Sequence, residues 1–147
     1  MNRVRTPAGL FAALTIAWSA FAADTQPASR PALEPIRYQR TGGIAGTNDV
    51  IEITKDGLIV VQGKLMASGK GQLTPEQMTK LAALFLDWKS LKTEYPTPPG
   101  TADGFTIRIR YGTVEVTASQ LNPQLPDSFK AARAALEEAA HGVTPAK

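Results

Sequence analysis

The stretch FTIRIRYGTVEVT, residues 105–117, decides what kind of fold this chain can form. Its first seven residues alternate strictly between apolar and polar side chains, which is the pattern of a strand with one buried face. Gly112-Thr113 then turns the chain into a second alternating run, so we expect the two runs to pair as an antiparallel hairpin. Arg108 and Arg110 would face solvent opposite Glu115. The stretch therefore predicts an antiparallel sheet with one face on a core.

Three more strands are expected upstream, over residues 36–40, 48–54 and 58–63. Between the last two lies Lys55-Asp56-Gly57, and an Asp-Gly pair between strand-like runs is a strong hairpin signal. Residues 64–72 either extend the third strand or form a connector, and the pattern leaves both open.

Leu73-Thr74-Pro75-Glu76-Gln77-Met78 marks the start of a helix. Thr74 is placed as the N-cap with Gln77 closing a capping box, and Pro75 suits the first helical position. Apolar residues at three- and four-residue spacing continue to Trp88 or Leu91, where we expect the helix to end.

A second helix is expected from Asp127, a good capping residue, to Gly142. The prolines between Thr93 and Gly104 predict a surface loop. The order of strands, helix, hairpin and helix predicts an α+β fold, an antiparallel sheet of about four to five strands with two helices packed on one face. We assign this domain to residues 36–141 and expect a disordered tail over 142–147.

The N-terminus has the features of a secretory signal peptide over residues 1–22. Arg3 and Arg5 form the cationic region, an apolar run follows, and Ala20-Phe21-Ala22 fits the small-x-small cleavage pattern. Residues 23–35 contain three prolines among polar and small residues, which predicts a flexible leader. We therefore expect a periplasmic or secreted protein with no membrane anchor after cleavage.

Composition argues against several function classes. The sequence has no cysteine, which excludes disulfides and thiol chemistry. Without residues 1–22 it keeps 14 basic and 13 acidic residues, scattered rather than clustered, so a nucleic-acid partner is not expected.

Candidate catalytic groups do not form a recognisable set. The one histidine, His141, falls at the end of the second predicted helix, where it suits the helix dipole. Glu137 and Glu138 are adjacent on that helix, point in different directions and are interpreted as solvated charges. Ser68 satisfies neither a nucleophile-elbow nor a phosphate-loop motif. We predict a protein that is not an enzyme and has no metal or cofactor.

The segment Thr41-Gly42-Gly43-Ile44-Ala45-Gly46 has more glycine than a simple hairpin turn requires. It is either a wide bulged turn whose glycines adopt positive φ, or a binding loop whose bare backbone approaches another surface with Ile44 at its tip.

An ordered set of motifs resembles the emfourins, small protein inhibitors of the thermolysin-like zinc metallopeptidase protealysin. The matching residues are Arg40-Thr41-Gly42-Gly43-Ile44-Ala45-Gly46, Leu73-Thr74-Pro75-Glu76, Asp103-Gly104-Phe105-Thr106-Ile107, and Pro126 with Leu136. The predicted signal peptide and leader depart from the family pattern.

The resemblance implies a non-catalytic protein that blocks the cleft of a thermolysin-like metallopeptidase. The candidate contact is the glycine-rich segment with the residue before it: Arg40, Thr41, Gly42, Gly43, Ile44, Ala45 and Gly46. The alternative is a periplasmic protein-interaction module on the same scaffold with no inhibitory activity.

Overall fold

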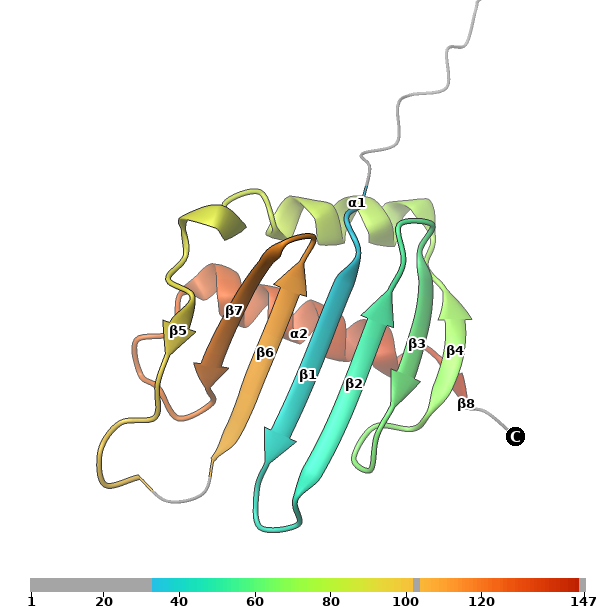
Figure 1. Ribbon diagram of the computed structural model, residues 1–147. Helices are drawn as coiled ribbons and strands as arrows, with labels where there is room; N and C mark the ends of the chain where they lie inside the picture. Colours follow the sequence, from blue (N-terminus) through green and yellow to red (C-terminus); the bar gives the residue numbers. More distant parts are fainter. Residues whose placement is uncertain (1–32, 102–103, 146–147) are drawn as a thin grey trace, which may run out of the picture.

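The computed structural model describes residues 33–101 and 104–145 of the chain. The predicted signal peptide and residues 23–32 of the predicted leader lie outside the described residues. Strands and helices form two layers, with both α-helices behind a single sheet (Figure 1). The strands are β1 (Ile36–Gly42), β2 (Thr47–Ile53), β3 (Leu58–Gln62), β4 (Gly69–Gln72), β5 (Glu94–Tyr95), β6 (Phe105–Tyr111), β7 (Val114–Ser119) and β8 (Thr144–Pro145). The helices are α1 (Pro75–Leu84), α2 (Asp127–His141) and a short 3-10 helix, η1 (Trp88–Ser90).

The sheet corrects the predicted fold in strand number and direction, although the class remains α+β. Its eight strands lie in the order β5-β7-β6-β1-β2-β3-β4-β8, and β5 pairs parallel to β7 while the other pairs are antiparallel. The prediction of four to five antiparallel strands was wrong because the segment left open at 64–72 contains β4 as a strand of its own, and because β5 and β8 have only two residues each. A two-residue strand is too short to show alternation, so sequence periodicity cannot reveal it.

The hairpin predicted over residues 105–117 forms as expected. Strands β6 and β7 pair with Tyr111 opposite Val114, which leaves Gly112-Thr113 as the turn. Arg108 Nε lies 3.3 Å from Glu115 Oε1 on the solvent side. The segment 64–72, which the sequence left open, forms a loop and then β4 as a separate strand.

Sequence signals correctly predict the start of α1 and the end of α2, but not the end of α1 or the cap of α2. Thr74 and Gln77 form the predicted capping box, with the Gln77 backbone N–H donating to Thr74 Oγ1 at 3.2 Å. However, α1 ends at Leu84, earlier than predicted, and η1 then carries Trp88 into the core. The apolar spacing is therefore kept while the backbone changes. In α2, the N-cap is Pro126 and Asp127 is the first helical residue, without the predicted side-chain cap.

Order extends beyond the predicted domain limits. Leu33 at the end of the predicted leader is 1% exposed, and Val143 in the predicted disordered tail is 9% exposed. Thr144 pairs with Lys70 in the sheet. A Cβ on Gly69 would lie 2.2 Å from the Thr144 carbonyl oxygen, so β4 and β8 approach closely because Gly69 has no side chain.

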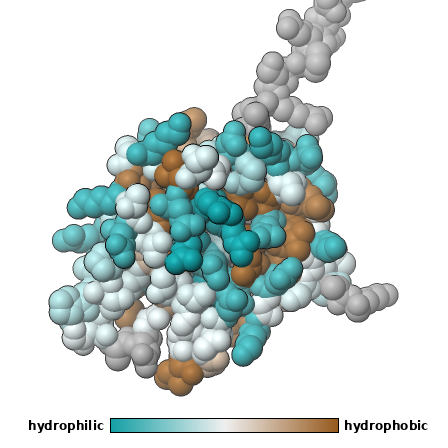
Figure 2. Space-filling view, in the orientation of Figure 1, coloured by the Kyte–Doolittle hydropathy of each residue, from teal (hydrophilic) through white to brown (hydrophobic). Residues whose placement is uncertain are grey.

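The core lies between the sheet and the helices. Alternation along each long strand sends side chains such as Tyr38, Ile51, Ile107 and Ile109 inward, where they are fully buried. Within the described part of the chain, no helix lies on the opposite face of the sheet. Figure 2 shows that face, with hydrophilic side chains over its centre and an apolar area over β2 and β3.

Candidate functional site at the loop end of the sheet

The two ends of the sheet differ in their connections. One end, here called the loop end, holds the β1–β2 loop (43–46), the β3–β4 loop (63–68) and the segments that follow β5 and β7. It lies at the bottom of Figure 1. The other end, here called the turn end, holds the tight turns β2–β3 (54–57) and β6–β7 (112–113).

The β1–β2 loop is a closed turn with an exposed apolar tip. Strands β1 and β2 remain paired up to Gly42 and Thr47. The Gly46 N–H donates to the Gly43 carbonyl at 3.1 Å, and the Thr47 hydroxyl donates to the Gly42 carbonyl at 2.9 Å. At the tip, Ile44 is 98% exposed. Figure 2 shows an isolated apolar area at this end of the molecule.

Two of the glycines are explained by how the loop is seated. Gly42 and Gly43 have φ of +107° and +70°, in the left-handed region that favours glycine. A Cβ on Gly43 would lie 2.8 Å from the Phe105 ring, and one on Gly42 would lie 2.8 Å from the Gly104 carbonyl oxygen. The bulged-turn interpretation therefore accounts for these glycines. It does not account for Ile44, which the described part of the chain leaves 98% exposed.

Arg40 supports the loop from below. Its side chain is only 15% exposed, and its Nη2 and Nε donate to Asp49 Oδ2 at 2.8 and 3.2 Å. The guanidinium also lies 5.3 Å from the centre of the Phe105 ring, which suits a cation–π contact. Of the seven predicted site residues, only Ile44, Ala45 and Gly46 are exposed. Arg40 and Thr41 through Gly43 form the base of the loop.

A polar cluster that the sequence analysis missed links this base to α2. The Tyr38 hydroxyl donates to Glu137 Oε1 at 2.7 Å, and Arg133 Nε donates to the same oxygen at 2.9 Å. Arg40 Nη1 lies 3.9 Å from that oxygen. Glu137 is therefore not the solvated charge that we predicted, whereas Glu138 is exposed as predicted and lines a groove between α1 and α2. Alternation was the available signal for Asp49, since it shares the inward face with Ile51 and Ile53.

The cluster shifts the ionisation of its members. Burial disfavours the charged carboxylates of Asp49 and Glu137, but hydrogen bonds outweigh burial and lower both pKa values. For Asp49 these bonds come from Arg40 and two backbone N–H groups, and for Glu137 from Tyr38 and Arg133. Burial and the bond to Glu137 raise the pKa of Tyr38 above its usual range. Tyr38 and the two carboxylates thus form a fixed arrangement of a neutral donor and charged acceptors.

The residues with catalytic potential are not brought together. His141 is the exposed last residue of α2, as predicted. Ser68 lies in the β3–β4 loop, where its hydroxyl accepts a hydrogen bond from the Gly63 N–H at 3.4 Å. Among the described residues, no group of three His, Cys, Asp or Glu side chains is placed to hold a metal ion.

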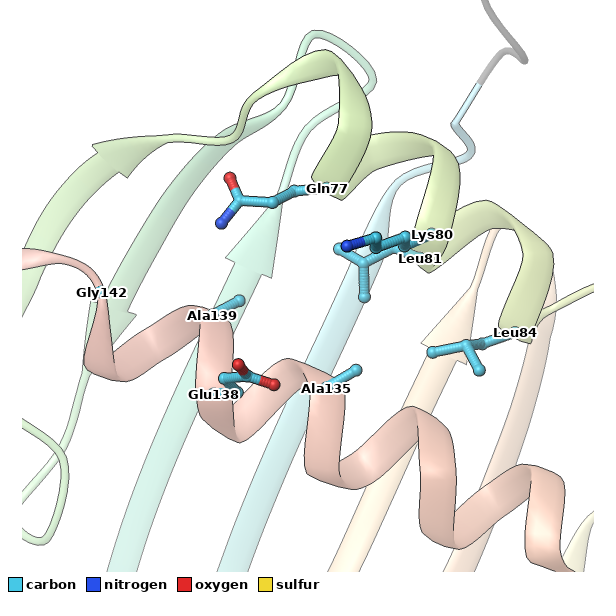
Figure 3. Close-up of a pocket in the computed structure, with 8 residues that line it drawn as sticks. All are labelled: Gln77, Lys80, Leu81, Leu84, Ala135, Glu138, Ala139 and Gly142. Atoms are coloured by element: carbon cyan, nitrogen blue, oxygen red, sulfur yellow. The ribbon is translucent and has the colours of Figure 1, made fainter.

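A groove of about 400 Å³ runs between α1 and α2. Figure 3 shows that the small side chains of Ala135 and Ala139 form one wall and Leu81 and Leu84 the other. Among the described residues that line the groove, Lys80 and Glu138 are the only charged ones, and none is a nucleophile or a histidine. The groove is a shallow gap between two helices and lacks the convergent polar groups of a reaction site.

No protein-family model matches the chain, and no curated protein sequence matches it. Within the residues that the structure describes, no helix is long and apolar enough to cross a membrane.

Proposed function

We propose that this chain is an exported, non-catalytic inhibitor of a thermolysin-like zinc metallopeptidase, and that its β1–β2 loop enters the peptidase cleft. The observation that carries the proposal is Ile44, a large apolar side chain 98% exposed on a loop whose base is held by buried contacts. The motif resemblance to the emfourins points to the same segment.

The loop is suited to binding because it is already ordered. Gly43 is seated against Phe105, and Arg40 and Asp49 hold the strands beneath it. A loop that is fixed before docking loses little conformational entropy on binding, so more of the contact free energy appears as affinity.

The same geometry favours inhibition over cleavage. A peptide bound along a cleft is usually extended, so that its backbone can pair and its side chains can enter alternate pockets. The Gly46 N–H to Gly43 carbonyl bond closes the loop into a turn instead. Strand pairing up to Gly42 and Thr47 opposes the unwinding that an extended conformation would require.

A direct test is inhibition of thermolysin by the purified protein. We expect peptide hydrolysis to fall as the protein is added, and mass spectrometry to show residues 41–46 still intact. Replacement Ile44→Ser should relieve inhibition by at least tenfold, since a buried apolar anchor commonly contributes that much. Unchanged hydrolysis at a large molar excess of protein, or rapid cleavage between residues 41 and 46, would refute the proposal.

One observation favours the alternative of an interaction module without inhibitory activity. Val50 and Val60 lie on the uncovered face of the sheet, partly exposed, and Leu58 beside them is 41% exposed. A module that binds through this face should lose its partner on Val60→Lys and keep it on Ile44→Ser. An inhibitor that acts through the loop should show the opposite pattern.

A further inference from the structure

We propose that the binding surface is composite, with Leu65 of the β3–β4 loop as a second apolar anchor beside Ile44, and that Asp49 fixes the two loops relative to each other. The partner surface that fits it is a protein cleft with two neighbouring apolar pockets. This inference rests on the proposed function and specifies the surface through which it acts.

The distribution of exposed apolar side chains supports a second anchor. Five large hydrophobic residues among those described are exposed, and three of them, Ile44, Leu65 and Leu121, lie at the loop end. Leu121 is 41% exposed and leans on Gly104, since a Cβ there would lie 2.8 Å from its Cδ1. Leu65 is 56% exposed and follows the strand next to β2.

The β3–β4 loop is held so that it presents Leu65. The next residue, Met66, is only 7% exposed and joins the core, which anchors the loop from below. The backbone N–H groups of Lys64 and Leu65 both donate to Asp49 Oδ1, at 2.9 and 3.0 Å. The backbone of Leu65 is therefore fixed by a hydrogen bond while its side chain is exposed.

Asp49 connects this loop to the base of the glycine-rich loop. Its other oxygen, Oδ2, accepts both bonds from Arg40 of β1. The carboxylate is 0% exposed, so the acceptor end of each of these bonds is shielded from water. One buried side chain of β2 thus sets the positions of the loops on either side of it.

Gly63 is required for this connection. A Cβ at position 63 would lie 2.0 Å from Asp49 Oδ1, so a side chain there would displace the carboxylate or the loop. The glycine allows the β3–β4 backbone to approach Asp49 closely enough for both hydrogen bonds.

The spacing of the loops indicates the shape of the partner. The β1–β2 and β3–β4 hairpins are centred two strand spacings apart, which is about 10 Å. About three residues of an extended peptide cover that distance. A peptide-binding cleft with apolar side-chain pockets at this separation would accept Ile44 and Leu65 together.

The experiment measures inhibition constants against thermolysin for matched serine variants. Replacement Leu65→Ser should weaken inhibition by about tenfold. Leu86→Ser is the control, because Leu86 is an equally large side chain, 80% exposed, in the segment after α1. It should change the constant by less than twofold.

A second variant tests whether the contact between Gly63 and Asp49 affects inhibition by positioning Leu65 or by a general loss of stability. Gly63→Ala keeps the Leu65 side chain but displaces the Asp49 carboxylate or the loop that presents Leu65, so it should weaken inhibition of the otherwise unchanged protein. In the Leu65→Ser background the same change should have little further effect, because the anchor that it positions is already gone. A merely structural role for Gly63 would weaken inhibition equally in both backgrounds.

The outcomes distinguish the two proposals. Inhibition that is sensitive to Ile44→Ser but as insensitive to Leu65→Ser as to Leu86→Ser overturns the composite surface and leaves the proposed function standing. Full additivity of Gly63→Ala and Leu65→Ser overturns the positioning role of Asp49. Absence of inhibition by the unaltered protein overturns the proposed function together with this inference.

Discussion

The loop end and the turn end of one sheet carry different kinds of residue. At the turn end, Lys55-Asp56-Gly57 connects β2 to β3 with the Gly57 N–H bonded to the Thr54 carbonyl at 2.9 Å, and its side chains are polar. At the loop end, Ile44 and Leu65 are exposed above a buried Arg40–Asp49 pair. Turn chemistry and solubility explain the first set completely. They do not explain exposed apolar tips over a buried polar base, and that contrast is the reason for proposing the loop end as a binding surface.

The largest expected effect comes from removing the charge under the loop end. Arg40→Ala leaves the fully buried Asp49 carboxylate without its cation, and breaking such a pair typically lowers the free energy of unfolding by about 3–5 kcal/mol. Urea unfolding at neutral pH measures it. The control is Arg37→Ala on the same strand, whose ion pair with Glu52 is half-exposed on the outer face and should contribute about 0–1 kcal/mol. Equal losses in the two variants would show that the buried Arg40–Asp49 pair contributes no more to stability than the half-exposed Arg37–Glu52 pair.

The next largest loss of stability is expected at Gly43, and Gly46 in the same β1–β2 loop is its comparison. Gly43→Ala combines an unfavourable φ of +70° with a clash against Phe105 and should cost about 2–3 kcal/mol. Gly46→Ala has a similar φ of +56° but nothing within 4 Å, so it should cost about 1 kcal/mol. Thermal unfolding of the two variants gives the difference. If they melt together, Phe105 does not seat the loop as the structure indicates.

Low pH should lower the free energy of unfolding by protonating the carboxylates of Asp49 and Glu137. Folding lowers the pKa values of Asp49 and Glu137 from ordinary values of 3.8 and 4.5. A lowered pKa in the folded state stabilises the protein above the ordinary value, and this stability is lost as the pH falls through the folded pKa. The loss should be smaller than for Arg40→Ala, because protonated carboxyl groups keep some of their hydrogen bonds.

The pH effect is checked by urea unfolding between pH 3 and pH 7. The slope of stability against pH below about pH 4 should be shallower for Asp49→Asn than for the unaltered protein. Asp56→Asn, at the exposed turn end, serves as the control and should keep the slope. A slope that is unchanged in Asp49→Asn would contradict the assigned role of this carboxylate.

Sequence predicted the parts of the fold that have their own periodicity or capping chemistry. The β6–β7 hairpin and the Thr74 capping box are examples, since each is specified by residues adjacent in the chain. Strands β5 and β8 could not be predicted, because their two-residue pairings depend on where distant segments arrive. The early end of α1 has the same origin: the spacing of Phe85 and Trp88 fits a helix, but tertiary packing turns the backbone into η1.

Sequence singled out the segment on which the proposed site is centred, but not the contacts that support it. The glycine-rich segment stood out because its composition exceeds the needs of a turn. Asp49 did not, although its alternation with Ile51 and Ile53 places it inward on β2. Its contacts with Arg40 and with the backbone of Lys64 and Leu65 depend on the register of three strands, which no local pattern encodes.

The smallest expected change in stability concerns the most exposed residue of the loop end. Ile44→Ser removes a side chain that contacts no core residue, so the free energy of unfolding should change by no more than about 0.5 kcal/mol. Thermal unfolding of this variant beside Leu86→Ser measures it, and the two should match. Ile44→Ser should nonetheless weaken inhibition, whereas Leu86→Ser should not. An apolar side chain that contributes nothing to folding but much to binding would mark the loop end as the functional surface, and a clear loss of stability on Ile44→Ser would instead make Ile44 part of the fold.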